Sequence, residues 1–398
     1  MKYKVGSLFA GVGGIDLGFQ NATVNDNMYE ILWANEIDEY AVETYQHNFK
    51  HPVIPGDIEK ILRPEREEDE TKREEYKKKR ENILEHQIDI LVGGFPCQAF
   101  SIAGNRKGFD DERGNLFWSI VDLINLLDQR HSKPSVLFLE NVKNLRNHDN
   151  GRTYKVIKNE LEKLGYTVKE QVINTKDVTR LPQNRERIYI VAFLDKKAAE
   201  QFTMFEKIND YKVKKNEEER REDIKNVLDL HLQKEDIEKY YYTKDKYPTY
   251  FMTEKEYLSI EKKERKEHRV NIEEEIVEKY EFYQVRRGMY VRKNQNGVCP
   301  TLTANMGTGG HNVPLIKVND GVRKLTPAET FKLQGFPIGS GYDLPTKYMG
   351  RAFSDGRLYK QSGNAVSVDV ASLIAKEILR ALDNTNNVVE EEKVAIVS

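Results

Sequence analysis

The stretch DILVGGFPCQAFS, residues 89–101, decides the fold of this chain. Its apolar run 90–92 is ended by two glycines, which predicts a buried parallel strand that opens into a tight turn. Pro96 fixes its own backbone angle and biases Phe95 away from helix, so Cys97 is expected on a rigid corner at the carboxyl end of the strand. Crevices at such ends are where open α/β sheets bind ligands.

A cysteine at a strand end serves either packing or chemistry. Free cysteine is among the most buried residue types, but a thiol becomes a strong nucleophile when a neighbouring base or cation favours the thiolate. The chain has one other cysteine, Cys299, so neither a disulfide framework nor a cysteine metal cluster is expected. A reducing, cytosolic compartment suits a reactive Cys97.

The composition indicates a soluble protein without an overall excess of positive charge. The 398 residues hold 63 Lys and Arg against 65 Asp and Glu, so binding to a nucleic acid would require local segregation of charge. The mean hydropathy is −0.71. The apolar stretch in MKYKVGSLFA is too short for a signal peptide and no run approaches a membrane span, so a cytoplasmic protein is expected.

A glycine loop lies upstream, between a predicted strand and a predicted helix. Residues 3–9 predict the strand, and FAGVGG (9–14) precedes the helix-like IDLGF. This order is typical of nucleotide-type cofactor sites and also of plain α/β architecture. The dinucleotide form is not matched, because Asp16 takes the place of its third glycine. Glu36, about 20 residues after the loop, is either a ribose acceptor or a surface acid.

Two polar strand ends follow the cysteine. The apolar strand 134–142 ends in Glu140, and poor solvation there is expected to raise the pKa of its carboxyl group, as a general acid requires; a capping or ion-paired role is the alternative. Arg185 and Arg187 alternate onto one face ahead of the strand 188–193, where they serve a site or pair with surface acids.

The remaining segments differ in charge. GDI (56–58) is expected to end a third strand. Residues 63–87 have acids and bases at helical spacing, which predicts a solvated helix with no catalytic or binding role. No chemistry is assigned to 198–280. Residues 282–319 contain no acid, and their cations and glycines favour a surface that follows DNA phosphates over a merely solvated face. The cations are Arg286, Arg287, Arg292, Lys293 and Lys317.

The C-terminal part predicts two further helices. Residues 323–337 form a capped amphipathic helix with Thr326 as N-cap, Pro327 first and Glu329 in the capping box. Residues 360–379 predict a turn followed by an apolar-faced helix, and the tail after Leu382 is expected to be frayed.

Several of these motifs, in this order, resemble those of the cytosine-C5 DNA methyltransferases. The resemblance rests on GGFPCQ, on Glu140-Asn-Val, on Gln183-x-Arg-x-Arg, on the 323–337 segment and on Gln361-x-Gly-Asn. It implies a doubly wound, mostly parallel α/β sheet of the S-adenosylmethionine-dependent methyltransferase fold with a smaller, irregular target-recognition domain. The expected domains are 1–197 for catalysis and cofactor, 198–345 for target recognition, and 346–398 returning to the first.

The resemblance also assigns roles. Cys97 would attack C6 of cytosine, Glu140 would protonate N3, and Arg185 and Arg187 would hold O2 and nearby groups. Ser7 and Ile37 depart from the commonest family residues, which is expected to affect the affinity for the cofactor but not its identity. Ala365, in place of a common serine, is a mild departure. The residues expected to bind S-adenosyl-L-methionine are Phe9, Gly11, Val12, Glu36, Ile37, Asp57, Ile58, Pro96, Leu116, Asn364, Ala365 and Val366.

The implied function is sequence-specific methylation of double-stranded DNA in a bacterial restriction-modification system. The target cytosine would be flipped out, with 98–108 and 300–312 filling the vacated space. A monomer is expected, without metal or membrane, whose cognate endonuclease acts on the same site without being bound. A transfer RNA cytosine-5 methyltransferase, a catalytically silent DNA-binding paralogue and a nicotinamide oxidoreductase are the alternatives.

Overall fold

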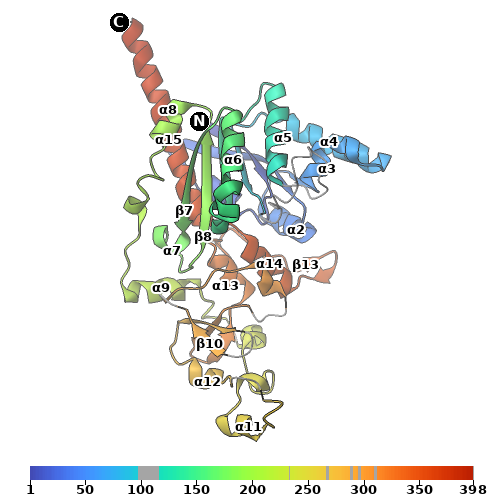
Figure 1. Cartoon of the computed structure of the whole chain (residues 1–398), viewed down its shortest axis with the longest axis vertical. Coiled ribbons are helices and arrows are strands. Elements are labelled where there is room, and N and C mark those ends of the chain that lie inside the picture. Colours follow the sequence, from blue (N-terminus) through green and yellow to red (C-terminus); the bar gives the residue numbers. More distant parts are fainter. Residues whose placement is uncertain are drawn as a thin grey trace. The chain divides into compact units, whose positions relative to one another are not determined.

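Two compact units make up the chain in the computed structural model (Figure 1). The first unit comprises Met1–Asn174, Glu186–Lys212 and Val366–Ser398, and the second comprises Thr175–Arg185 and Val213–Ala365. Residues 346–365, predicted to return to the first unit, therefore lie in the second. The structure describes residues 1–96, 116–232, 234–265, 269–286, 290–294, 297–308 and 312–397, without the side chains of Lys234 and 388–397.

An eight-stranded, mostly parallel sheet forms the centre of the first unit, as the sequence predicted. Its order is β2-β3-β1-β5-β6-β8-β7, and β4 also pairs with β3. The pairs of β1 with β3 and β5, of β3 with β4, and of β5 with β6 are parallel, whereas β2 and the two last strands pair antiparallel. The strands are β1 Lys2–Leu8, β2 Thr23–Val24, β3 Asn27–Glu36, β4 Val53–Pro55, β5 Ile90–Gly94, β6 Val136–Val142, β7 Thr167–Asn174 and β8 Glu186–Phe193.

Both faces of the sheet are covered, which explains why its strands are continuously apolar. On β6, Leu137 and Leu139 join the core cluster that includes helices α5 and α6. Phe138 points to the opposite face, where its ring lies 5.2 Å from that of Phe19 on α1. The helices of this unit are α1 Gly14–Gln20, α2 Glu39–Asn48, α3 Ile58–Leu62, α4 Glu70–Leu84, α5 Leu116–Gln129, α6 Arg152–Lys163, α8 Lys196–Gln201 and α15 Val368–Val397.

The charged segment 63–87 contains a helix, α4, as its spacing predicted. Asp69 caps α4 by accepting a hydrogen bond from the Lys72 backbone N–H, and only the last turn of the helix buries apolar side chains, those of Ile83 and Leu84. The ion pair Lys79–Glu75 follows the i, i+4 spacing read from the sequence.

The tail expected to fray is helical instead. Helix α15 continues to Val397. Its first half is close to α1, where a Cβ on Gly18 would lie 2.6 Å from Ala371 Cβ. Asp383 accepts hydrogen bonds from Asn25 and Asn27, so tertiary contacts hold the helix at the point where the sequence predicted fraying to begin.

The second unit is built on a smaller antiparallel sheet, ordered β10-β9-β11-β12. Its strands are β9 Phe282–Arg286, β10 Tyr290–Lys293, β11 Leu315–Val318 and β12 Gly321–Lys324, and β13 Lys347–Tyr348 with β14 Arg351–Ala352 form a separate hairpin. Its helices are α7 Thr175–Val178, α9 Glu217–Val227, α10 Lys234–Ile237, α11 Glu254–Ser259, α12 Ile272–Glu275, α13 Pro327–Lys332 and α14 Asp355–Asn364.

The cap of helix α13 confirms the prediction and adds a buried ion pair. Thr326 and Glu329 form the capping box with Pro327 in the first turn. Both oxygens of Glu329 also accept hydrogen bonds from the guanidinium of buried Arg323, at 2.6 and 2.7 Å. One carboxylate therefore ties the helix to strand β12.

The turn expected within 360–379 lies at 365–367, between the end of helix α14 at Asn364 and the start of α15 at Val368. Ser354 caps helix α14, and Leu358 and Tyr359 are buried. A Cβ on Gly363 would lie 2.2 Å from the carbonyl carbon of Thr303. Gly363 therefore permits close packing of helix α14 against the segment at Thr303.

Candidate functional site

The loop after β1 is held against the end of β3 by a glutamate. Phe9 and Gly11 adopt left-handed backbone conformations, with φ of 54° and 56°. The Gly11 N–H donates to Glu36 Oε2 at 2.7 Å, and Glu36 Oε1 accepts from the N–H groups of Ile37 and Asp38. Burial raises the pKa of Glu36, against the effect of these hydrogen bonds. Three predicted cofactor residues are thus brought together.

The same loop leaves room for a ligand. A Cβ built on Gly11 would meet no atom within 4 Å, whereas one on Gly13 would lie 2.3 Å from the Phe49 ring. Ile37 is 66% exposed although it is apolar. A carboxylate has about four acceptor positions, of which three are used at Glu36. An adenosine-type ligand fits this arrangement, in which the backbone at Gly11 is open, the side chain of Ile37 offers an apolar face and Glu36 has one acceptor position left.

The other predicted cofactor residues of the first unit lie at nearby strand and helix ends. Strand β4 ends at Pro55, before GDI, and the Gly56 N–H donates to the Glu36 carbonyl oxygen. Asp57 caps helix α3 and Ile58 is its buried first residue, so neither belongs to a strand. The remaining placements are Val12, buried; Leu116, half-buried at the start of α5; Pro96, exposed; and Val366, buried.

A buried carboxyl group lies beneath this loop. Asp16 on α1 is fully buried, and the Ser7 hydroxyl donates to its Oδ2 at 3.1 Å. Burial raises the pKa of Asp16 to about 6. The folded protein therefore holds this proton at pH values where the unfolded chain has lost it, and stability falls as the pH rises from about 4 to about 6.

Replacing Asp16 with asparagine is expected to stabilise the protein above pH 6. The raised pKa of Asp16 corresponds to a cost of up to about 3 kcal/mol at neutral pH, which an uncharged amide of the same shape avoids. The difference in free energy of unfolding between variant and wild type, measured by denaturant titration, should be near zero at pH 4 and largest at pH 7.5. A difference that does not change with pH would contradict this assignment.

The corner that leads to Cys97 is held by a neighbour of the predicted acid. The Asn141 side-chain N–H donates to the Phe95 carbonyl oxygen at 2.7 Å, and its Oδ1 accepts from the Val142 N–H. Asn141 is buried. Cys97 itself, like residues 98–108, lies outside the described residues. Asn141 thus couples the ends of β5 and β6, the two strands that carry the predicted nucleophile and acid.

Glu140 is buried beside Arg187. Arg187 Nε lies 3.0 Å from Glu140 Oε1 in a pair whose side chains are both largely buried. A Cβ on Gly94 would lie 3.3 Å from Glu140 Oε2 and 3.5 Å from Val366 Cγ2. The guanidinium of Arg187 therefore faces the carboxyl group that the sequence predicted as the general acid.

Arg185 does not share the environment of Arg187, although their alternation predicted one face. Arg185 is buried in the second unit, where its guanidinium donates to the carbonyl oxygens of Leu302, Gly363 and Ala365 at 2.7 to 3.2 Å. The preceding Gln183 is also buried and donates to the Leu333 carbonyl oxygen. Both side chains connect distant segments of the second unit.

The last predicted cofactor residues fall on both sides of a unit boundary. Asn364, exposed, and Ala365, buried, belong to the second unit, whereas Val366 belongs to the first. The Val366 carbonyl oxygen would lie 2.3 Å from a Cβ on Gly14, at the start of α1. Because Gly14 has no side chain, the backbone of Val366 can approach the glycine loop.

Cys299 is unsuited to nucleophilic chemistry. It is fully buried in a core cluster of the second unit, and burial raises the pKa of its thiol well above the usual value. Its backbone N–H donates to the Pro182 carbonyl oxygen. Cys299 packs the second unit, which leaves Cys97 as the candidate nucleophile.

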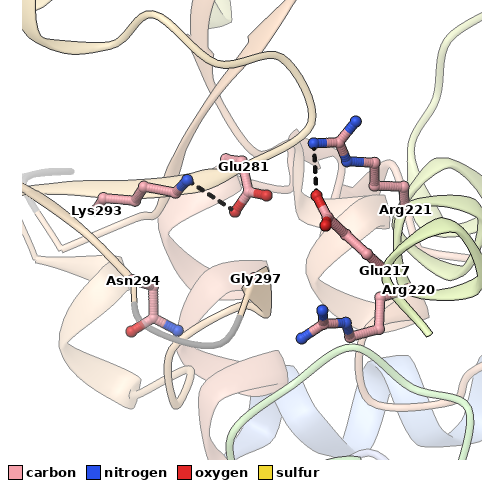
Figure 2. Close-up of a pocket in the computed structure, with 7 residues that line it drawn as sticks. All are labelled: Glu217, Arg220, Arg221, Glu281, Lys293, Asn294 and Gly297. Carbon is pink, nitrogen blue, oxygen red and sulfur yellow. Dashed lines mark hydrogen bonds and ion pairs between the residues drawn. The ribbon is translucent and has the colours of Figure 1, made fainter. Parts of the chain in front are cut away.

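A pocket of about 340 Å³, lined mainly by charged residues, lies between α9 and the ends of β9 and β10 (Figure 2). Buried Glu281 lies 3.8 Å from Lys293, and Glu217 pairs with Arg221 at 2.9 Å. Lys293 belongs to the acid-free stretch, so the pocket adjoins the predicted recognition surface and contains none of the predicted catalytic residues. Its lining is Glu217, Arg220, Arg221, Glu281, Lys293, Asn294 and Gly297.

Sequence reasoning missed three residues of the site. Gly94 leaves space beside Glu140, Asn141 holds the Phe95 carbonyl, and Asp16 is buried under the loop. Gly94 and Asn141 stood inside quoted motifs, but only their neighbours were given roles. Their contacts join residues that are distant in sequence, which periodicity does not reveal.

The described residues contain neither a metal-binding cluster nor a membrane-spanning helix. No group of three or more His, Cys, Asp or Glu side chains in this part of the chain could hold a metal ion. Within the same residues, no helix has the length and apolar character needed to cross a membrane.

Comparison with known proteins covers nearly the whole chain. A family model described as C-5 cytosine-specific DNA methylase matches residues 3–380. The chain is 42% identical over 380 residues to the Type II methyltransferase M.Bsp6I of Bacillus sp. (strain RFL6), covering 95% of this chain and 99% of that protein. It is 34% identical over 386 residues to the Type II methyltransferase M.HpaII of Haemophilus parainfluenzae, covering 96% and 91%.

Solved structures agree on the fold. The chain is similar to a crystal structure of a Spodoptera frugiperda DNMT2 mutant, with a TM-score of 0.58 and 15% identity, covering 95% of this chain and 99% of that one. The S. pombe Dnmt2 methyltransferase gives the same TM-score at 16% identity, covering 94% and 98%. At these identities the likeness concerns the fold alone.

Proposed function

This chain belongs to the C-5 cytosine-specific DNA methylase family and is a DNA (cytosine-5-)-methyltransferase, EC 2.1.1.37, and from that premise we propose how its residues act and on what. The proposed substrate is a cytosine within one short sequence of double-stranded DNA. The proposed role is to protect host DNA in a restriction-modification system. The observation that carries this role is the 42% identity to a Type II methyltransferase over almost the full length of both proteins.

The proposed cofactor is S-adenosyl-L-methionine. When bound, it supplies the electrophilic methyl group that C5 receives. Glu36 would accept from the ribose, Ile37 would lie against the adenine, and Asp57 with Ile58 would contact its edge. The open backbone at Gly11 and the exposure of Ile37 support this assignment. Phe9, Val12, Pro96, Leu116, Asn364, Ala365 and Val366 complete the proposed set.

The proposed chemistry begins with a bond between Cys97 and the base. C5 of cytosine is a poor nucleophile within an aromatic ring. Addition of the Cys97 thiolate to C6 forms a carbon–sulfur bond and moves the C5–C6 electron pair so that C5 becomes nucleophilic. After C5 is methylated, it loses its proton to a base, and the electrons of that C–H bond restore the double bond as the thiolate leaves. Water is a candidate for the base.

Glu140 and the arginines would stabilise the charge that addition creates. A proton or hydrogen bond from Glu140 to N3 prevents negative charge from accumulating on the ring, and a transferred proton returns to Glu140 when the thiolate leaves. Arg187, 3.0 Å from Glu140, would orient it and the cytosine O2. The role of Arg185 at O2 stays a prediction, and its three carbonyl contacts support a positioning role for it.

A base stacked within a duplex is inaccessible to these groups, so the target would be flipped out. Residues 98–108, which lie outside the described residues, and the segment 300–312 are proposed to fill the vacated space. The enzyme is proposed to act as a cytosolic monomer, with the cognate endonuclease recognising the same site independently.

Bisulfite sequencing tests the substrate and the modified atom together. DNA from cells that express the protein should show protected cytosines in a single short sequence context. Cells that express the Cys97→Ala variant provide the matched control and should show none. Methylation of RNA in place of duplex DNA, or protected cytosines without a common context, would contradict the proposal.

A further inference from the structure

The hairpin β13–β14 of the second unit, here called the basic hairpin (Lys347–Ala352), ends in a strained and exposed apolar tip. Tyr348 pairs with Arg351, so Met349 and Gly350 form a two-residue turn. Met349 has a φ of 48° and is 83% exposed. Turns with two left-handed residues favour Asn, Asp and Gly, because other side chains fit this conformation poorly.

Met349 does little for the stability of the folded unit. Its side chain is largely in solvent, and a Cβ on the neighbouring Gly350 would meet no atom within 4 Å. The turn therefore extends away from the rest of the unit. A bulky apolar residue that is both strained and exposed indicates a partner that covers it.

The charges beside the tip indicate an anionic partner. Lys347 and Arg351 are exposed, and residues 344–354 contain no acid. Lys347 pairs across the hairpin with Ala352, whereas Arg351 pairs with Tyr348. Because neighbouring residues on a strand point to opposite faces, one cation lies on each face of the ribbon. The two walls of a DNA groove, each a row of phosphates, match this arrangement.

The basic hairpin is fastened to the predicted recognition segment within the same unit. Helix α14 begins three residues after β14, and Figure 1 shows β13 beside this helix. A Cβ on Gly307 would lie 2.4 Å from the Gly356 carbonyl oxygen. The helix that follows the hairpin therefore packs directly against the acid-free stretch 282–319.

We propose that the basic hairpin enters a groove of duplex DNA, with Met349 as an apolar wedge against the bases and with Lys347 and Arg351 on phosphates of the two walls. Wedges of this kind partly unstack a base step and widen the contact with protein. The inference rests on the proposed function in taking duplex DNA as the substrate.

Met349→Gly tests the wedge without weakening the fold, since glycine favours a positive φ. The probe is a duplex oligonucleotide that carries the sequence context found by bisulfite sequencing, bound to the full chain. We expect the Kd to rise about tenfold, as for the loss of one base contact. The slope of log Kd against log salt should stay unchanged, because no charge is removed, and the Tm should stay equal or rise. Met349→Leu should bind like the wild type.

Replacing the two cations of the basic hairpin should change the salt dependence of binding, which Met349→Gly should not. Lys347→Gln and Arg351→Gln should each weaken binding and reduce the salt slope by about one, as expected for one lost phosphate contact. Leu258→Ala, at another exposed apolar position of this unit, should leave the Kd unchanged and serves as the control.

Each other outcome overturns the inference. Wild-type affinity in Met349→Gly, or equal losses in Met349→Gly and Met349→Leu, would exclude a wedge. A change of oligomeric state in Met349→Gly at unaltered DNA affinity would assign the tip to a protein partner. A wild type that binds no duplex would refute the proposed function itself, and with it this inference.

Discussion

Replacing Cys97 with alanine is expected to abolish methyl transfer while S-adenosylmethionine affinity stays within about twofold of the wild type. Loss of an essential nucleophile typically lowers turnover by about 10⁴-fold or more. The cofactor groups proposed on the β1 loop and at the end of β3 do not include the thiol, so their contacts remain. Transfer of a labelled methyl group to duplex DNA, with calorimetric titration of the cofactor, measures the two quantities separately.

The control for this experiment is the second cysteine. Cys299→Ala removes a buried thiol from the core of the second unit and should lower the Tm while transfer persists. A duplex with fluorine at C5 of the target cytosine should trap the wild type covalently, because the carbon–fluorine bond resists the final elimination. Methylation by Cys97→Ala would end the covalent mechanism.

Replacing Glu140 with glutamine is expected to lower kcat by about 10² to 10⁴-fold, the range for loss of a general acid. Glutamine keeps the shape of the side chain but cannot deliver a proton to N3. Arg187, 3.0 Å away and largely buried, would also lose its anionic partner. Steady-state kinetics should show the loss in kcat with a smaller change in KM, since Glu140 acts mainly as charge develops.

A matched glutamate distinguishes chemistry from packing. Glu170 on β7 belongs to the same sheet and pairs with Arg146 at 3.6 Å. Glu170→Gln should leave kcat unchanged. If Glu140→Gln kept wild-type turnover, or if its loss were explained by unfolding in a thermal melt, the carboxyl group would not be the acid.

The architecture of the first unit could be predicted from local patterns. Short apolar runs ended by glycine or acid mark β5 and β6, and both strands lie where the sequence placed them. The charged helix α4 and the capping box of α13 followed from spacing and cap chemistry. These features depend on residues within a few positions of one another, so the local sequence is sufficient to predict them.

The contacts that shape the site depend on residues far apart in the chain. Glu140 meets Arg187, Asn141 holds Phe95, and Arg185 reaches Ala365. Alternation placed both arginines on one face, but packing sent one to a carboxylate and the other to backbone carbonyls.

By itself, the sequence determined the family and the mostly parallel sheet of the first unit, and it predicted Cys97 as the nucleophile, because motif spacing and periodicity are local properties. Only the tertiary structure decided which partner Glu140 has, why Gly363 lies in a helix, and that Met349 stands exposed at a turn. The physical reason is that the burial and the partners of a side chain depend on which distant segments pack together in the folded protein. The residues next to it in the chain do not indicate which segments those are.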